Sequence, residues 1–298
     1  MHIPPILRVL AAVAVGIAIT VAIGFFTFIV GLPYRLLIHP WLRQWTKNPL
    51  TAMPRLWGTT IHCVCLEGML GIRTELAVRI NRPIGPDELV VCIANHPPSI
   101  GLASFFWAVL TRILPRIVAV AKREHLTNVA FGPFFGWPLW AIHGGIFIDR
   151  TNAASACESL RNGIRRLASG SLIMIFPDMR RPTAARIEAD RERFAGRVDG
   201  IEHFTRTLVP RSGGLLEILQ ALDRPVRVMN ITNAFSGESE HLLDAAHICG
   251  HTLHIEIEEL EEPLPRDQAA LQAWLNQEWW RKNAQIKRWQ MRLLRRIA

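Results

Sequence analysis

The sequence predicts an α/β fold in which a mixed sheet is flanked by helices and preceded by a membrane helix or helix pair. Two observations carry this prediction: one long uncharged segment near the start, and an alternation of strand-like and helical runs from Glu75 onward. Strand-like runs lie near 75–80, 89–94, 116–121, 145–149, 171–176, 227–231 and 251–258. Helical spacing occupies 101–114, 152–168 and 211–222, with Asn152 as the predicted cap of the second helix. Such alternation is typical of a sheet covered by helices.

The segment Val9–Leu32 contains no charged side chain and is long enough to cross a bilayer as one helix. It has no small-residue cleavage site, so we expect a retained anchor rather than a signal peptide. Pro33 is compatible with the end of a span and with the bend of a two-helix element within one leaflet, and a buried helix pair is a third alternative. Positive charge is heavier after this segment than before it, where only Arg8 lies. We expect a protein of the bacterial inner membrane or an equivalent membrane, and the positive-inside rule predicts that the body of the chain lies on the cytoplasmic side.

Composition agrees with a membrane-associated protein. Half of the 298 residues are apolar, and 34 Lys and Arg against 25 Asp and Glu give a net charge of +9. This excess suits an anionic lipid surface and anionic substrates. Nucleic acid is not expected as a partner, because no binding motif and no basic stripe with interleaved aromatic residues occurs in the body of the chain. The five cysteines show no Cys-x-x-Cys spacing, so we expect reduced thiols and no metal site.

Three parts are expected along the chain. Residues 1–70 form the membrane anchor and an interfacial segment, 71–264 the α/β domain, and 265–298 a basic, Trp-rich C-terminal helix. The tryptophans of Pro40–Met69 suit either the headgroup layer or an ordinary core. The C-terminal helix suits either an anionic membrane surface or docking onto the domain. The charge-dense stretch Arg180–Val198 predicts an exposed loop or helix.

Asn95-His96 is the first candidate for chemistry, because it follows the strand-like run at 89–94 directly. Pro97 and Pro98 then stop the strand, and the predicted helix begins at Gly101. An α/β sheet presents its working groups at such strand-to-helix junctions, at the carboxyl ends of its strands. A histidine there has a pKa near neutrality and can serve as a general base.

Three later segments complete a pattern: Gly145-Ile146-Phe147-Ile148-Asp149-Arg150, Phe176-Pro177-Asp178 and Pro210-Arg211-Ser212-Gly213-Gly214. Taken in order with Asn95-His96, they resemble the motif blocks of the glycerophospholipid acyltransferases of the lysophosphatidic acid acyltransferase type. The last segment resembles an element of the lysocardiolipin acyltransferase branch. The resemblance covers roughly residues 55–290, and the second block carries it most strongly.

The resemblance implies a glycerolipid acyltransferase-like fold and a membrane-bound enzyme. Such an enzyme transfers a fatty acyl group from acyl-CoA or acyl carrier protein to a lysophospholipid hydroxyl of the 1-acylglycerol-3-phosphate kind. Beyond this co-substrate it implies no cofactor. His96 corresponds to the general base, with Asn95 and Ser99 beside it. The residues implied in substrate binding, chiefly phosphate-binding cations and their neighbours in the blocks, are Lys122, Asp149, Arg150, Pro177, Asp178, Arg180, Arg181 and Arg211.

One departure from the family pattern concerns the partner of His96. In the family pattern, four residues follow the Asn-His pair and the next residue is Asp. Gly101 stands at that position in this chain. No carboxylate occurs between Glu88 and Glu124. The third block is also changed, with Asp178 for Glu and Met179-Arg180 for Gly-Thr. Possible substitutes for the missing partner are the hydroxyl of Ser99 and a carboxylate from a neighbouring strand end, Asp149 or Asp178.

These changes leave an alternative open, namely a catalytically impaired pseudoenzyme that serves as a lipid-binding or donor-binding subunit. A serine hydrolase is not expected, because the chain has no Gly-x-Ser-x-Gly elbow.

Overall fold

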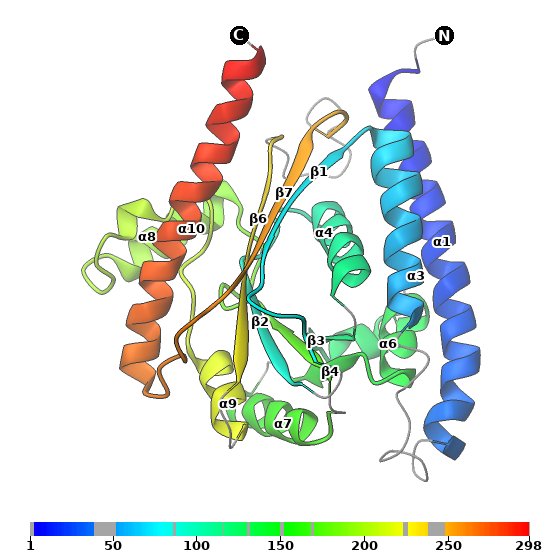
Figure 1. The fold of residues 1–298 in the computed structure, drawn as a ribbon, viewed down its shortest axis with the longest axis horizontal. Helices are drawn as coiled ribbons and strands as arrows, with labels where there is room; N and C mark the ends of the chain where they lie inside the picture. Colours follow the sequence, from blue (N-terminus) through cyan, green and yellow to red (C-terminus); the bar gives the residue numbers. More distant parts are fainter. Residues whose placement is uncertain are drawn as a thin grey trace.

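The computed structural model describes residues 3–38, 52–85, 88–114, 116–129, 132–149, 152–167, 170–222, 226–237 and 248–297, with the side chains of residues 100, 101, 153 and 292–297 left out. Its centre is a seven-stranded sheet in the order β1-β7-β6-β2-β5-β3-β4 (Figure 1). Neighbouring strands are parallel except β6 and β7, which are antiparallel, so the predicted mixed sheet is confirmed. The strands are β1 Arg73–Arg79, β2 Val90–Ala94, β3 Ile117–Lys122, β4 Gly145–Ile148, β5 Leu172–Ile175, β6 Arg227–Phe235 and β7 Thr252–Glu259.

The strands β2 and β5 lie side by side in the middle of the sheet, and every residue of both is buried. Their sequences are continuous apolar runs rather than alternating ones, because helices cover both faces of this part of the sheet. Since the two strands are parallel, their carboxyl ends lie at the same edge. The turns after Ala94 and Ile175 are therefore brought together.

Helices divide between the two faces of the sheet (Figure 1). On one face α4, Ile100–Ile113, packs with the N-terminal helices around a core that includes Leu66, Phe106 and Leu110. The other face is covered by α7, Ala153–Arg165, α9, Gly213–Ala221, and α10, Gln268–Ile297. The predicted cap of α7 is confirmed, because Asn152 Oδ1 accepts hydrogen bonds from Ala154 N at 2.9 Å and Ser155 N at 3.3 Å. The short helices α5, Glu124–Thr127, and α6, Trp137–Ala141, with the π-helical turn η4, Gly132–Gly136, and the 3-10 turn η5, Ile201–His203, complete the layers.

The N-terminal region is an antiparallel helical pair (Figure 1). Its first member is α1, Pro5–Pro33, continued by the π-helical turn η1, Tyr34–Ile38. Its second is α3, Ala52–Thr60, continued by the π-helix η3, Ile61–Leu70. The direction of packing follows from Arg8 Nε, which donates to Met69 O at 2.7 Å, and from Trp57 Nε1, which donates to Thr20 Oγ1 at 3.0 Å.

The segment Pro5–Leu37 is long and apolar enough to cross a membrane, with a mean hydropathy of 2.6 and only 17% of its most apolar window buried. Large apolar side chains such as Phe25 and Phe26 face outward from it. Gly24 lets this helix approach η4 closely, because a Cβ there would collide with the carbonyl of Phe134. Trp57 lies against the core, whereas Trp41 and Trp45 of the same expected interfacial segment lie outside the described residues.

The tryptophans of α10 face the domain. Trp279 is fully buried, Trp274 and Trp280 pack beside it, and Trp289 stacks on His254 with ring centroids 5.3 Å apart. Of the two alternatives that the sequence leaves open for this helix, the structure selects docking. The stretch Arg180–Val198, expected as a loop or helix, forms α8, Ala184–Phe194.

Candidate active site

Asn95 locks the end of β2 onto β6. Its Oδ1 accepts from Asn233 N at 2.9 Å and its Nδ2 donates to Asn233 O at 2.9 Å, while Asn233 Nδ2 donates to Asn95 O at 2.6 Å. Both residues are buried, so these bonds satisfy amides that would otherwise lose water without compensation. The arrangement holds the backbone just before His96 in place. A direct part of Asn95 in catalysis stays a prediction.

His96 is half-buried where β2 ends, and its ring lies 4.9 Å from that of Phe176 at the end of β5. Its main-chain N–H donates to Asp178 Oδ2 at 2.7 Å, and its Nδ1 lies 3.0 Å from Pro97 O. Asp178 thus reaches His96 across the sheet edge, which was one of the predicted alternatives. The bond, however, is to the main-chain N–H of His96 and not to its imidazole ring. Ser99 Oγ accepts from Leu102 N at 3.2 Å and caps α4. Its predicted part in the site therefore stays a prediction beside a clear structural role.

The carboxyl group of Asp178 is almost completely buried, with 3% of the residue exposed. Burial raises the pKa of Asp178 to about 7, against the opposing effects of the His96 N–H and the Lys282 ammonium. Lys282, from α10, is fully buried and donates from Nζ to Ile231 O at 2.6 Å. Burial lowers the pKa of Lys282 to about 8, while Glu278 and Asp178 oppose this shift. The end of β2 thus lies close to buried ionisable groups, because Asp178 binds the His96 N–H and interacts with Lys282.

The raised pKa of Asp178 predicts a specific dependence of stability on pH. Between about pH 4 and 7 the folded chain keeps a proton on Asp178 that the unfolded chain releases, so the free energy of unfolding falls as pH rises through this range. The shift from 3.8 to about 7 corresponds to a loss on the order of 4 kcal/mol. We expect Asp178→Asn to lack this slope. Chemical unfolding of both proteins in detergent from pH 4 to 8 measures the difference, and parallel curves would contradict the burial of an ionisable carboxyl.

Met179 adopts a backbone conformation that favours glycine, with φ of 60°. In the family block that this segment resembles, glycine stands at the same position. A residue with a side chain costs about 1–2 kcal/mol in this region of backbone space. The turn thus keeps the conformation that glycine would favour, and Met179 N donates to Phe176 O at 2.9 Å within it.

A cavity of about 1130 Å³ opens beside His96. One part of its wall is apolar and comes from α1, α3, α4 and α6, including Ile23, Trp57 and Trp107. The other part carries cations, and four of these were predicted as substrate-binding residues: Lys122, Arg180, Arg181 and Arg211. The cavity therefore joins a lipid-like wall, a candidate base and a positively charged region.

Only some of the other predicted site residues line this cavity. Pro177 is buried, lines the cavity and accepts at its carbonyl from Arg211 N at 2.9 Å, which ties the 208–214 segment to the end of β5. Lys122 ends β3, and its Nζ lies 3.9 Å from the exposed carboxylate of Glu124. Asp149 follows β4 and is not among the described residues that line the cavity. Arg150 lies outside the described residues, so its phosphate-binding role stays a prediction.

Sequence reasoning missed several residues that the structure brings to this region: Arg186, Arg193, Asn233 and Lys282. One signal for Asn233 is present, since Asn230, Thr232 and Asn233 interrupt an apolar strand and buried polar groups need partners. Lys282 carries no such signal, because it belongs to a run of basic residues of which Arg281, Lys287 and Arg288 are exposed.

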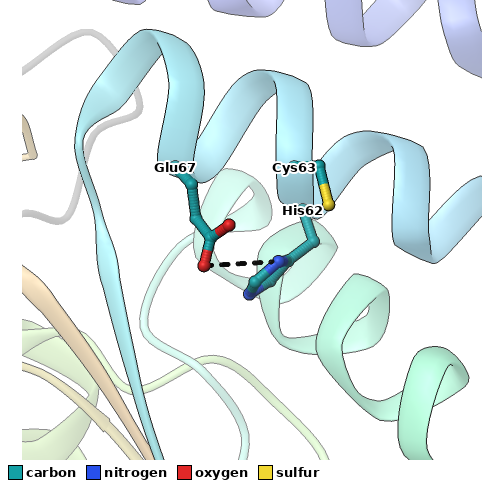
Figure 2. Close-up of side chains that lie close together, drawn as sticks. All are labelled: His62, Cys63 and Glu67. Carbon is teal, nitrogen blue, oxygen red and sulfur yellow. Dashed lines mark ion pairs between the residues drawn. The ribbon is translucent and has the colours of Figure 1, made fainter.

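One cluster elsewhere has the composition of a metal site. Figure 2 shows His62, Cys63 and Glu67 on η3, whose ligand atoms lie within 4.8 Å of one another. Arg112 Nη1 lies 3.1 Å from His62 Nδ1, and His62 Nε2 lies 3.0 Å from Thr74 Oγ1. Both ring nitrogens therefore have hydrogen-bond partners, and a guanidinium faces the nitrogen that a cation would need. We interpret the cluster as a structural link between η3, α4 and β1.

Comparison with known proteins gives a family and a similar fold. A family model described as Acyltransferase matches residues 75–232. Among solved structures, the 1-acyl-sn-glycerophosphate (LPA) acyltransferase PlsC from Thermotoga maritima is similar, with a TM-score of 0.51 and 12% sequence identity over 89% of this chain and 95% of that chain. No curated protein matches this sequence.

Proposed function

Since this chain belongs to the acyltransferase family, we propose that it transfers a fatty acyl group from a thioester donor to the hydroxyl of a lysophospholipid, with His96 as general base. The observation that carries the proposal is the placement of His96 at the wall of a cavity that is apolar on one part and cationic on another. A lysophospholipid has the same two chemistries, an acyl chain and a phosphate. The PlsC fold of the solved relative adds support at the level of architecture.

The size and walls of the cavity suit this class of acceptor. Its volume of about 1130 Å³ is above the upper end of ordinary ligand pockets, roughly 300–1,000 Å³. Ile23 and Thr27 of α1 line it, so the helix proposed to lie in the membrane also forms part of the substrate wall. An acyl chain can then remain against apolar surface while the glycerol reaches His96. We propose that Lys122 and Arg181 bind the acceptor's phosphate, since ammonium and guanidinium groups suit phosphate oxygens.

We further propose that the carbonyl of Pro97 orients the base in place of the missing aspartate. If Nδ1–H of His96 donates to Pro97 O, 3.0 Å away, Nε2 is left as the proton acceptor. Nε2 then takes the hydroxyl proton as the hydroxyl oxygen attacks the thioester carbonyl. The carbon–sulfur bond breaks, and the imidazolium returns the proton to the leaving thiolate. A carbonyl fixes the tautomer but lacks the negative charge that stabilises an imidazolium, so we expect a slow enzyme.

The experiment that tests this function measures transfer of labelled acyl groups from acyl-CoA and from acyl carrier protein to a panel of acceptors. We expect turnover with lysophosphatidic acid and less with monoacylglycerol, which has no phosphate for the cations to bind. Equal turnover with both acceptors would contradict phosphate recognition. No turnover with any acceptor, in a folded protein, would contradict the transferase function.

Gly101 supports a second candidate, a donor-binding or lipid-binding pseudoenzyme, because it stands in the first turn of α4 where the family has its aspartate. We expect Gly101→Asp to raise kcat about tenfold or more by supplying the charged partner of His96. Gly101→Asn is the matched control, since it adds a similar side chain without charge. Equal kcat values for the two variants would show that a carboxylate at this position does not assist the base. Activity found only in Gly101→Asp would favour the pseudoenzyme for the natural chain.

A further inference from the structure

A second, smaller cavity of about 240 Å³ adjoins the main one on the side of α8. Three arginines line it: Arg180, Arg193 and Arg211. Two of them, Arg180 and Arg211, also line the main cavity, so the two spaces share part of their walls. Arg193 lines only the smaller cavity and comes from the last turn of α8. An occupant of the main cavity can therefore extend toward α8 past these shared residues.

The arginines are held close together without enough negative charge to neutralise them. The guanidinium carbons of Arg193 and Arg211 lie 5.4 and 5.8 Å from the ring centroid of Phe194, within the range of cation–π attraction. Main-chain hydrogen bonds hold the backbone of two of these arginines. Arg211 N donates to Pro177 O at 2.9 Å, and Arg180 N donates to Asp178 O at 2.6 Å. Burial lowers the pKa of Arg211, and the charges of Arg193 and Arg180 lower it further.

Two carboxylates line the same cavity, and each accepts a hydrogen bond from a main-chain N–H group. Asp190 Oδ2 accepts from Val209 N at 3.3 Å, and its Oδ1 lies 4.0 Å from Arg180. Asp178 Oδ2 accepts from the main-chain N–H of His96. Both residues are buried, whereas Arg180 and Arg193 are exposed. The accessible rim of the cavity is therefore positive, which is the arrangement that binds phosphate oxygens.

We propose that Arg180, Arg193 and Arg211 bind the phosphate groups of coenzyme A, the carrier of the acyl donor. This inference rests on the proposed function and deepens it by assigning the donor its own subsite. The phosphates of coenzyme A are separated from its thioester by the long pantetheine arm, so they can occupy a cavity beyond the one that holds the reacting atoms. The phosphate of lysophosphatidic acid is attached next to the reacting hydroxyl carbon and must stay in the main cavity.

The position of the small cavity also favours a donor that arrives from water. Of the described residues that line it, none belongs to α1 or α3, and α8 lies on the opposite side of the sheet from those helices (Figure 1). In the proposed function a lysolipid binds against α1, whose residues line the main cavity. A water-soluble, multiply charged thioester can approach from the α8 side, away from α1.

The test measures binding of free coenzyme A, pantetheine and lysophosphatidic acid to the full chain in lipid nanodiscs by calorimetry. We expect Arg193→Ala to raise the Kd for coenzyme A about tenfold, since it removes a charge-assisted contact. Its Kd for lysophosphatidic acid should not change, and pantetheine, which lacks phosphate, should bind weakly to wild type and variant alike. Arg193→Lys should retain part of the affinity. Arg197→Ala is the matched control, because Arg197 is exposed just beyond α8 and does not line the cavity.

An unchanged Kd for coenzyme A in Arg193→Ala would overturn the inference, as would an equal loss in Arg197→Ala or a loss confined to lysophosphatidic acid. Thermal unfolding of each variant checks that it is folded, and Arg193→Gln replaces Arg193→Ala if the latter is not. Because free coenzyme A binds without turnover, the result is separate from that of the transfer assay. Binding that depends on Arg193 in a chain without transferase activity would retain the subsite and reject the proposed reaction.

Discussion

His96→Ala is expected to abolish measurable acyl transfer. A general base contributes about 10²–10⁴ to the rate of a proton-transfer step, so removing the proposed base should leave little activity. We expect the variant to fold, because the bond to Asp178 comes from the main-chain N–H of residue 96 and survives the substitution. The imidazole itself is only half-buried, so its loss leaves a small space at the cavity wall.

The measurement is the initial rate of transfer from acyl-CoA to lysophosphatidic acid, with kcat and KM determined separately. A base acts in the transition state, so kcat should fall while the KM values change little. His203→Ala is the matched control, because this histidine is exposed and lies outside the cavity. Wild-type turnover in His96→Ala would reject His96 as the base.

Lys282→Met is expected to lower the free energy of unfolding by about 3–5 kcal/mol, the usual cost of breaking a buried charged cluster. Methionine fills a similar volume, so the loss reports charge and hydrogen bonding rather than an empty space. The substitution removes the donor to Ile231 O and the cation that opposes the charges of Asp178 and Glu278. Glu278 keeps its bonds to Asn230 at 2.6 Å and to Arg281 at 3.0 Å, so Asp178 should be affected more strongly.

Chemical unfolding of the purified protein in detergent at pH 7 measures this effect. Lys287→Met on the same helix is the matched control, since Lys287 is exposed and its loss should change stability by less than about 0.5 kcal/mol. Similar stabilities for the two variants would mean that the buried cluster around Lys282 contributes nothing net. In Lys282→Met the pKa of Asp178 should rise further, because the nearby positive charge of Lys282, which opposes the effect of burial, is gone.

Much of the fold follows from local patterns. The continuous apolar runs that became β2 and β5 are typical of strands buried on both faces, and each of the seven strands falls on a predicted run. The role of Asn152 as a helix cap could also be predicted from the sequence, because a cap binds the main-chain N–H groups two and three residues later. The motif resemblance predicted the acyltransferase family, which the family model confirms.

The division of the chain into three parts, the cytoplasmic orientation and the roles of the individual site residues stay predictions. The sequence placed His96 at a strand end, and the parallel pairing of β2 with β5 put Asp178 next to it. The sequence did not predict which atoms these side chains contact. Asp178 binds the main-chain N–H of His96, and Ser99 caps a helix.

The seven strands, the helices α1, α4, α7, α9 and α10, the fold class and the motif residues thus followed from the sequence, because periodicity, caps and short motifs act over a few residues. The tertiary structure alone decided the strand order, the antiparallel turn of β6 against β7, and the docking of α10. It also decided the pairing of Asn95 with Asn233, 138 positions away, and the meeting of Arg193 with Arg211 over one ring. Contacts between such distant positions depend on how whole layers pack, and no local pattern in the chain records that packing.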